Sequence, residues 1–87
     1  MAKFPLKVIE RPLLVQGMLG KDKSGNAVII IDNKGNSDEE RNITLWHEVV
    51  HLLRHVGGHS QDEESVEDAA RRLAKACPEA INWVRKQ

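Results

Sequence analysis

The feature that most constrains this chain is the segment His47-Glu48-Val49-Val50-His51, which has the pattern H-E-x-x-H. An α-helix has about 3.6 residues per turn, so side chains four residues apart lie on the same face. In a helix, the imidazoles of His47 and His51 can therefore reach one metal ion, and Glu48 can reach a water molecule on that ion. The segment predicts a helix with a metal-binding face, and the chemistry it indicates is zinc-assisted attack of water on an amide.

The surrounding residues predict that this helix is long and central. It is expected to begin near Ser37 or Asp38, because Ser37 and Glu40 form a capping-box pattern. Gly57 and Gly58 are typical of a helix end. Apolar residues at helical spacing form a core-facing stripe, and others make a further side of the helix apolar, which indicates a buried element. The stripe consists of Leu45, Val49, Leu52 and Val56, and the further side of Trp46 and Val50.

The residues before this helix predict a small β-region. Leu6 to Val15 favour extended structure, and Pro12 confines them to an edge strand or to two short strands. Gly17 to Asn26 reads as a turn region. Ala27–Asp32 is the clearest strand, because it is short and β-branched. A hairpin or meander of two or three strands is therefore expected.

Two further helices are expected after Gly58. Ser60 and Glu63 form a second capping-box pattern, and Pro78 ends the helix that follows. The predicted fold is thus α+β, a single minimal zincin-like domain over residues 1–87. A two- to three-stranded antiparallel sheet would pack on the central helix, followed by a glutamate-bearing helix and a short C-terminal helix. The apolar residues expected to face inward are Val66, Ala69, Ala70, Leu73 and Cys77 on the second helix, and Ile81, Trp83 and Val84 on the third.

Composition limits the partners and the setting. The 87 residues suit one small domain with a thin core, which a bound metal would help to stabilise. Thirteen basic and 13 acidic residues give a net charge of zero, so direct binding to nucleic acid or to an anionic membrane is not expected. The single cysteine excludes a disulfide scaffold, and no apolar run is long enough for a signal peptide or a membrane span. A soluble, cytoplasmic protein is expected.

A hydrolytic zinc site usually has three protein ligands and one open position. A third histidine six residues after His51 is excluded, because that residue is Gly57. A glutamate of the following helix is the other source. On a helical wheel Glu63 and Glu67 both border the apolar face, whereas Glu64 points away. The wheel alone leaves Glu63 and Glu67 as alternatives.

The stretch from Ile29 to Pro78 resembles the ImmA/IrrE family of small zinc metallopeptidases. The resemblance rests on the strand end Ile30-Ile31-Asp32, on the H-E-x-x-H helix, and on Glu67-Asp68-Ala69-Ala70-Arg71-Arg72-Leu73-Ala74. This last run is similar to the family pattern E-x-x-A-(N or D)-x-F-A before a proline. It implies a zincin-like fold, Zn²⁺ as the cofactor and Glu67 as the third ligand. Arg71 departs from the family's Asn or Asp, at a position expected to orient a ligand.

The expected chemistry assigns further roles. Glu48 would accept a proton from the attacking water and pass it to the leaving amine. A second oxyanion donor is often tyrosine or histidine, but the chain has no tyrosine. His55, His59 or Arg54 therefore remain, and His55 is the catalytic candidate, with a structural alternative at the helix C-terminus. The strand Ala27–Asp32 is expected to be a core strand, to offer an exposed edge to an extended peptide, or to do both.

Three functions remain open from the sequence. The first is a zinc-dependent metallopeptidase that cleaves one specific intracellular protein. The resemblance implies a separate DNA-binding repressor as that substrate, in the regulation of a phage or another mobile element. The second is a catalytically weak or inactive metal-binding module that docks partners on a peptidase scaffold. The third is a structural domain without metal.

Overall fold

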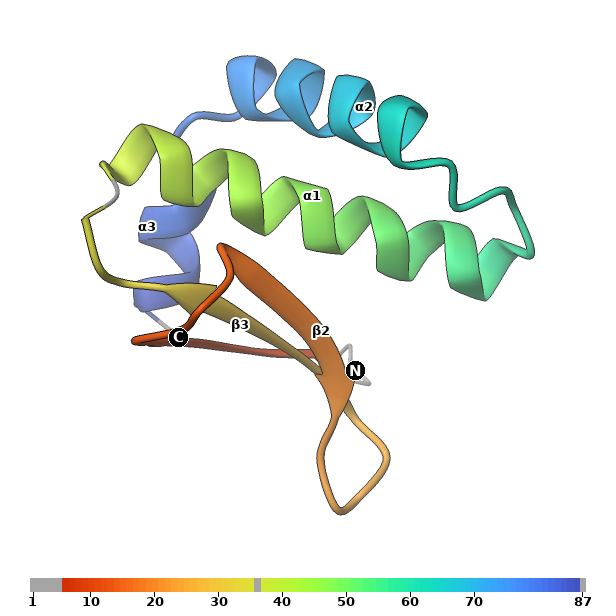
Figure 1. Cartoon of the computed structure of the whole chain (residues 1–87), viewed down its shortest axis with the longest axis horizontal. Coiled ribbons are helices and arrows are strands. Elements are labelled where there is room, and N and C mark those ends of the chain that lie inside the picture. Colours follow the sequence, from red (N-terminus) through yellow and green to blue (C-terminus); the bar gives the residue numbers. More distant parts are fainter. Residues whose placement is uncertain (1–5, 36, 87) are drawn as a thin grey trace.

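The computed structural model describes residues 6–35 and 37–86. Its layers are a three-stranded sheet, the long helix α1 that crosses one face of the sheet, and α2 on the far side of α1 (Figure 1). The short helix α3 packs beside α1 over the same face of the sheet. The α+β fold expected from the sequence is confirmed. The elements are β1 (Leu6–Arg11), β2 (Gly17–Lys21), β3 (Ala27–Asp32), α1 (Asp38–Gly57), α2 (Glu63–Ala76) and α3 (Ala80–Arg85).

The sheet is mixed, with the strand order β1-β3-β2. β2 and β3 form an antiparallel hairpin, but β1 pairs with β3 in parallel, so the expectation of a purely antiparallel sheet is wrong. The loop after β1 crosses the end of β3 instead of turning back beside β1. Asp32 holds this crossover, because its Oδ1 accepts from Leu13 N at 3.0 Å and its own N–H donates to Gln16 O at 2.8 Å.

Residues 17–21 form a strand and not the turn expected from Gly17 and Gly20. The turn is confined to the residues between Lys21 and Ala27, where Asp22 Oδ1 accepts from the N–H groups of Ser24 and Asn26. The glycine at position 17 serves close packing, since a Cβ there would lie 2.6 Å from Thr44 Cγ2 of α1. Glycine within a strand often marks such an approach of backbone to a neighbour.

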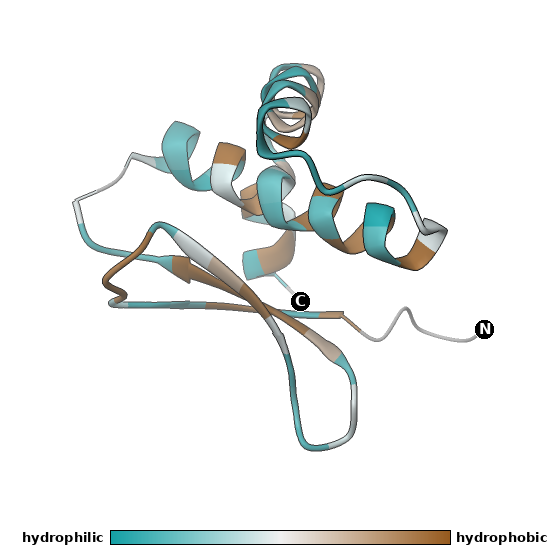
Figure 2. Ribbon diagram, turned by 45° about the vertical axis from the view of Figure 1, so that its right-hand side comes forward, coloured by the Kyte–Doolittle hydropathy of each residue, from teal (hydrophilic) through white to brown (hydrophobic). Residues whose placement is uncertain are grey.

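The core lies between the sheet and the helices. Ile29 and Ile31 of β3 are fully buried against Leu45, Ala80 and Ile81. In Figure 2 the apolar parts of α1 and of the strands face one another across this layer. A second buried contact joins α1 to α2, where Val66 and Ala70 are fully buried and the small alanine allows a close approach.

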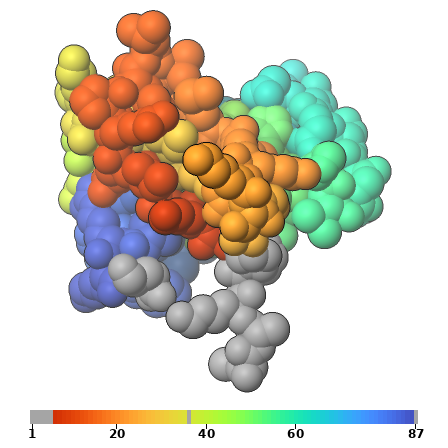
Figure 3. All heavy atoms as spheres, turned by 90° about the horizontal axis from the view of Figure 1, so that it is seen from below, coloured from red at the N-terminus to blue at the C-terminus, as the bar shows by residue number. Residues whose placement is uncertain are grey.

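Three residues predicted to face inward are exposed: Val56, Leu73 and Trp83. Leu73 of α2 is 36% exposed. Val56 is 74% exposed, because the last turn of α1 extends beyond the sheet (Figure 1). Trp83 is 62% exposed at the rim of an apolar pocket of about 200 Å³ between α1, α3 and β1. The sheet face opposite α1 is the surface seen in Figure 3, where β1 and the β2 hairpin lie in front. Within residues 6–35 and 37–86, no helix is both long and apolar enough to cross a membrane.

The ends of α1 agree with their sequence signals, whereas the start of α2 does not. Ser37 Oγ accepts from Glu40 N at 3.2 Å, and Gly58 ends α1 with a φ of +71°. The N-cap of α2 is Asp62, which accepts from Ser65 N at 3.0 Å, so the expected cap at Ser60 is wrong. Aspartate is as good an N-cap as serine. Because the cap is Asp62, Gln61 lies outside the helix.

Asn42 connects all three helices, which sequence reasoning missed. This residue is 2% exposed, and its Nδ2 donates to the carbonyls of Ala74 and Cys77 at 3.4 and 3.3 Å. Its Oδ1 accepts from Ile81 N at 3.1 Å. A buried amide with these three partners fixes the turn from α2 to α3 against α1.

Arg85 links α3 to β1 and to the first residue of α1. Its guanidinium donates to both carboxylate oxygens of Glu10, at 3.0 and 2.8 Å, and to Asp38 Oδ1 at 3.0 Å. The hydrogen bonds from Arg85 lower the pKa of Glu10 and the pKa of Asp38 below their ordinary values. The bidentate geometry favours a defined position for α3 over β1.

Candidate metal centre

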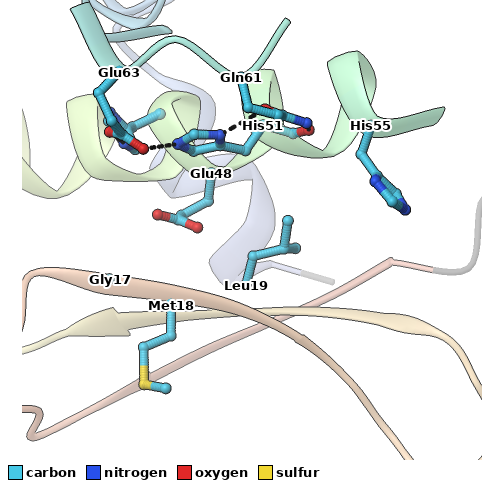
Figure 4. A pocket seen from close by; sticks show the side chains of 9 residues that line it. Gly17, Met18, Leu19, Glu48, His51, His55, Gln61 and Glu63 are labelled. Carbon is cyan, nitrogen blue, oxygen red and sulfur yellow. Dashed lines mark hydrogen bonds and ion pairs between the residues drawn. The ribbon is translucent and has the colours of Figure 1, made fainter. Parts of the chain in front are cut away.

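The H-E-x-x-H residues occupy the middle of α1, where the helix lies between α2 and β2. The rings of His47 and His51 have centroids 4.8 Å apart, and their side chains are 20% and 17% exposed. The start of α2 brings Glu63 to these rings, and Glu48 points instead toward β2 (Figure 4). The spacing of the segment thus produces the shared histidine face that the sequence predicts.

Glu63 is the acidic residue that joins the two histidines. Its Oε1 lies 3.0 Å from His51 Nε2, and its Oε2 lies 3.3 Å from His47 Nε2. The ligand atoms of His47, His51 and Glu63 all lie within 4.8 Å of one another. These three side chains therefore converge on one point at the side of α1.

Glu67 contacts the other nitrogen of His47. Its Oε2 lies 2.9 Å from His47 Nδ1, and its Oε1 lies 3.1 Å from Arg71 Nε. Glu67 thus reaches the site one helical turn after Glu63, but on the far side of the ring. Ligation by Glu67 stays a prediction, and the geometry around His47 supports Glu63 for that role. Glu64 is exposed and lies outside the cluster, as the helical wheel predicts.

The ring nitrogens show that this cluster suits a cation. Each of the four nitrogens of His47 and His51 faces an acceptor oxygen, from Glu63, Glu67 or Gln61. A neutral imidazole carries only one N–H. If Nδ1 of each ring donates its N–H to Glu67 or Gln61, the Nε2 lone pair of each ring faces a carboxylate oxygen of Glu63. A proton or a metal ion is then needed between Nε2 and that oxygen. Two imidazoles and one carboxylate are also a common donor set for hydrolytic zinc.

Glu48 lies in a different setting from the other carboxylates. It is 9% exposed and points into the space between α1 and β2 (Figure 4). Burial raises the pKa of Glu48, while the nearby His47 and His51 oppose this shift. A carboxylate whose pKa is raised takes up a proton more readily than one in water.

A groove passes beside Glu48 between α1 and β2. One part, of about 480 Å³, is lined by residues of both elements and by the loop before α2. A second part, of about 320 Å³, shares Gly17, His47 and Glu48 with the first and extends toward Val15 and Ile43. The edge strand along this groove is β2. The expectation of an exposed edge on Ala27–Asp32 is wrong, because β3 is the central strand, and the alternative of a core strand is confirmed.

The candidates for a second oxyanion donor lie near the C-terminal end of α1. His55 is exposed and lines the groove, apart from the two metal-site histidines (Figure 4). Arg54 Nη1 donates to Ser60 O at 3.4 Å, and His59 lies over Gly57, where a Cβ would be 2.8 Å from His59 Cδ2. His59 and Arg54 thus have roles in the loop, and a catalytic role of His55 stays a prediction.

Sequence reasoning missed Gln61. Its side chain turns back from the loop onto His51, with Gln61 Oε1 2.8 Å from His51 Nδ1. The signal available in the sequence was the N-cap, because an assignment of the cap to Asp62 leaves Gln61 in the loop that faces the histidines.

One comparison with known proteins gives a match. A peptidase family model, described as the IrrE N-terminal-like domain, matches residues 1–77. The matched range includes the elements from β1 to α2, and with them His47, His51 and Glu63. No curated protein and no solved structure matches this chain.

Proposed function

Because this chain belongs to the peptidase family of the IrrE N-terminal-like domain, we propose that it is a zinc-dependent metallopeptidase that hydrolyses peptide bonds of a specific protein. The observation that carries the proposal is the convergence of His47 Nε2, His51 Nε2 and Glu63 beside the buried Glu48. A metal-ligand set and a neighbouring carboxyl in one groove are the parts that metal-assisted hydrolysis needs.

In this proposal His47, His51 and Glu63 hold the zinc ion, and Glu67 orients His47. The carboxylate of Glu67 accepts from His47 Nδ1, which leaves the Nε2 lone pair for the metal. Such carboxylate–histidine pairs fix the ring and raise its basicity as a ligand. The arrangement explains why α2 presents two glutamates, one turn apart, to the same imidazole.

A bound zinc ion would supply an activated water molecule and polarise the scissile carbonyl. Glu48 would accept a proton from the attacking water as the water oxygen bonds to the carbonyl carbon. Glu48 would then pass the proton to the amide nitrogen as the C–N bond breaks. The raised pKa of Glu48, caused by burial, favours the first of these transfers, the uptake of the proton, because the protonated carboxyl is less costly in a partly dry site.

β2 offers the binding surface for the substrate. An extended peptide that adds to this edge strand would run along the groove and pass over Glu48. Main-chain hydrogen bonds would hold the peptide, and the groove on either side of Glu48 would receive its side chains. We include in the proposal a separate DNA-binding repressor of a phage or another mobile element as the substrate, cleaved in the cytoplasm. The family resemblance alone supports that part.

The experiment is incubation of zinc-loaded protein with the repressor encoded nearest to its gene, with cleavage followed by mass spectrometry. The wild-type protein is expected to cut at one or a few sites, and Glu48→Gln is expected to bind zinc but to cut at least about 100-fold more slowly. Cleavage at the wild-type rate by Glu48→Gln would refute the mechanism. Cleavage of unrelated unfolded proteins at the same rate would refute the specificity.

A second function, a metal-binding interaction module with weak catalysis, is favoured by Arg71. Its guanidinium pairs with Glu67 Oε1 at 3.1 Å, and this positive charge reduces the negative charge that the other oxygen, Oε2, presents to His47. In that case Glu48→Gln would leave partner binding unchanged, whereas His47→Ala would lower both zinc binding and thermal stability. Partner capture by wild-type and Glu48→Gln protein separates the two functions.

A further inference from the structure

Gln61 makes two hydrogen bonds to one residue, His51. Its Oε1 lies 2.8 Å from the ring nitrogen Nδ1, and its Nε2 donates to the main-chain oxygen of His51 at 3.0 Å. Figure 4 shows the amide beside the ring, opposite the contact with Glu63. The side chain of Gln61 therefore spans from the backbone of α1 to the imidazole that the same residue carries.

The second of these bonds decides the direction of the first. The main-chain oxygen of His51 can only accept, so the amide nitrogen of Gln61 must face it. The amide oxygen must then face His51 Nδ1, and this oxygen can only accept. Nδ1 must therefore carry a proton, so in the neutral ring it is the Nε2 lone pair of His51 that is directed at Glu63. The orientation of the amide follows from the hydrogen-bond network.

The loop around Gln61 is itself held against α1. His59 N donates to Arg54 O at 2.8 Å, and Asp62 N donates to Ser60 Oγ at 3.3 Å. Asp62 begins α2 as its N-cap. Gln61 therefore lies between a loop that is hydrogen-bonded to α1 and the capped start of α2, and both contacts favour the position in which its amide meets His51.

We propose that Gln61 is a positioning residue of the metal centre, which sets both the tautomer and the ring orientation of His51. Glu67 does the same for His47, so the two histidines are held by two different chemical groups, a neutral amide and a carboxylate. This inference rests on the metal site of the proposed function. It adds that the loop before α2 takes part in metal binding although it supplies no ligand.

The first test is zinc affinity, measured by competition with a chromophoric chelator. Gln61→Ala is expected to weaken zinc binding by about 10–100-fold, the usual effect of removing a group that orients a ligand. Gln61→Glu keeps the acceptor for Nδ1 and is expected to recover most of the affinity. Ser65→Ala, at an exposed residue in the first turn of α2 that is not part of the His47, His51 and Glu63 cluster, is the control and should bind like wild type. Equal affinities for Gln61→Ala and wild type would overturn the proposal.

The second test needs no metal. Long-range proton–nitrogen NMR on zinc-free protein, at a pH where the ring is neutral, reports which nitrogen of His51 is protonated. The wild-type protein is expected to show the Nδ1–H form, and Gln61→Ala a mixture or the Nε2–H form. The same tautomer in both proteins would overturn the proposal. If wild-type protein bound no zinc, the proposed function would fail while this result still decided the role of Gln61.

Folding of the variants is checked by thermal unfolding. If Gln61→Ala does not fold, Gln61→Met replaces it, because methionine has a similar volume and lacks the amide oxygen and the amide nitrogen. The tautomer and affinity expected for Gln61→Met are those of Gln61→Ala. Wild-type behaviour in both measurements would count against the proposal in the same way.

Discussion

Glu67 Oε2 lies 2.9 Å from His47 Nδ1, on the opposite side of the imidazole from Glu63. The two glutamates are one turn apart on α2, and the ring of His47 stands between them. In the proposed metal site, a carboxylate on Nδ1 leaves Nε2 as the ligand atom, and Glu63 is the carboxylate that Nε2 faces. This relationship assigns different tasks to two residues that the helical wheel cannot separate.

The first prediction concerns these two glutamates. Glu63→Gln is expected to remove most zinc binding, because the site loses its only anionic ligand. Glu67→Gln is expected to weaken binding by about 10–100-fold, because the amide still accepts from His47 Nδ1 without the charge. Chelator competition measures both. A larger loss for Glu67→Gln than for Glu63→Gln would return the ligand role to Glu67.

The second prediction concerns the approach of β2 to α1. In Gly17→Ala the new methyl group would lie 2.6 Å from Thr44 Cγ2 and 3.5 Å from Glu48 Cγ, so β2 or α1 must move. We expect a loss of about 1–3 kcal/mol in the free energy of unfolding and slower hydrolysis. Urea unfolding measures the first effect. Gly20→Ala is the control, because a Cβ at position 20 meets nothing within 4 Å.

A double variant sharpens this prediction. Thr44→Ser removes the Cγ2 methyl group that the new side chain would strike. Stability is expected to be higher in the double variant Gly17→Ala, Thr44→Ser than the sum of the single changes predicts. Strict additivity would show that the contact with Thr44 is not the cause.

The third prediction concerns Asn42. Asn42→Leu has a similar volume but leaves the carbonyl of Ala74 and the N–H of Ile81 without this partner. The carbonyl of Cys77 also loses Asn42 but keeps its bonds from Trp46 Nε1 and Ala80 N. Each buried polar group left unpaired costs about 1–3 kcal/mol, so α3 is expected to detach or the protein to unfold at a much lower temperature. Hydrogen exchange of α3 amides distinguishes the two results. An unchanged melting temperature would contradict the role of Asn42.

The fourth prediction concerns pH. The pKa of Glu10 and the pKa of Asp38 are lowered in the folded protein by hydrogen bonds from Arg85. Their contribution to stability is therefore present above the unfolded-state pKa, and is lost as the pH falls through the lowered folded-state pKa. Glu10→Gln should destabilise the protein at neutral pH. It should make little difference at a pH below both the folded-state and the unfolded-state pKa of Glu10. The destabilisation caused by Arg85→Met should depend on pH in the same way. If the free energy of unfolding of Glu10→Gln differed from that of wild type by the same amount at every pH, this prediction would be contradicted.

Local signals in the sequence predict local structure well. Ser37 and Gly58 mark the ends of α1, and the β-branched run Ala27–Asp32 is a strand. The parallel pairing of β1 depends on the crossover held by Asp32, a contact between distant residues that no local pattern encodes. Trp83 is exposed for a related reason, because periodicity gives the faces of a helix but not which face the neighbours cover.

In the candidate site, too, the local sequence predicts the part that one helix carries but not the part that depends on packing between helices. The spacing of His47 and His51 predicts their shared face, because one helix carries both. The proposed third ligand belongs to another helix, and which glutamate reaches the two histidines depends on how far α2 is shifted along α1. That shift is set by packing at Val66 and Ala70 and by the cap at Asp62, and it brings both Glu63 and Glu67 to His47.

The most direct measurement is a crystal structure of the zinc-loaded protein, with the metal located by its anomalous scattering. We expect one zinc ion bound by Nε2 of His47, Nε2 of His51 and the carboxylate of Glu63, with Glu67 and Gln61 on the two Nδ1 atoms. A zinc ion bound elsewhere, or an empty space between these three side chains at saturating zinc, would contradict the account.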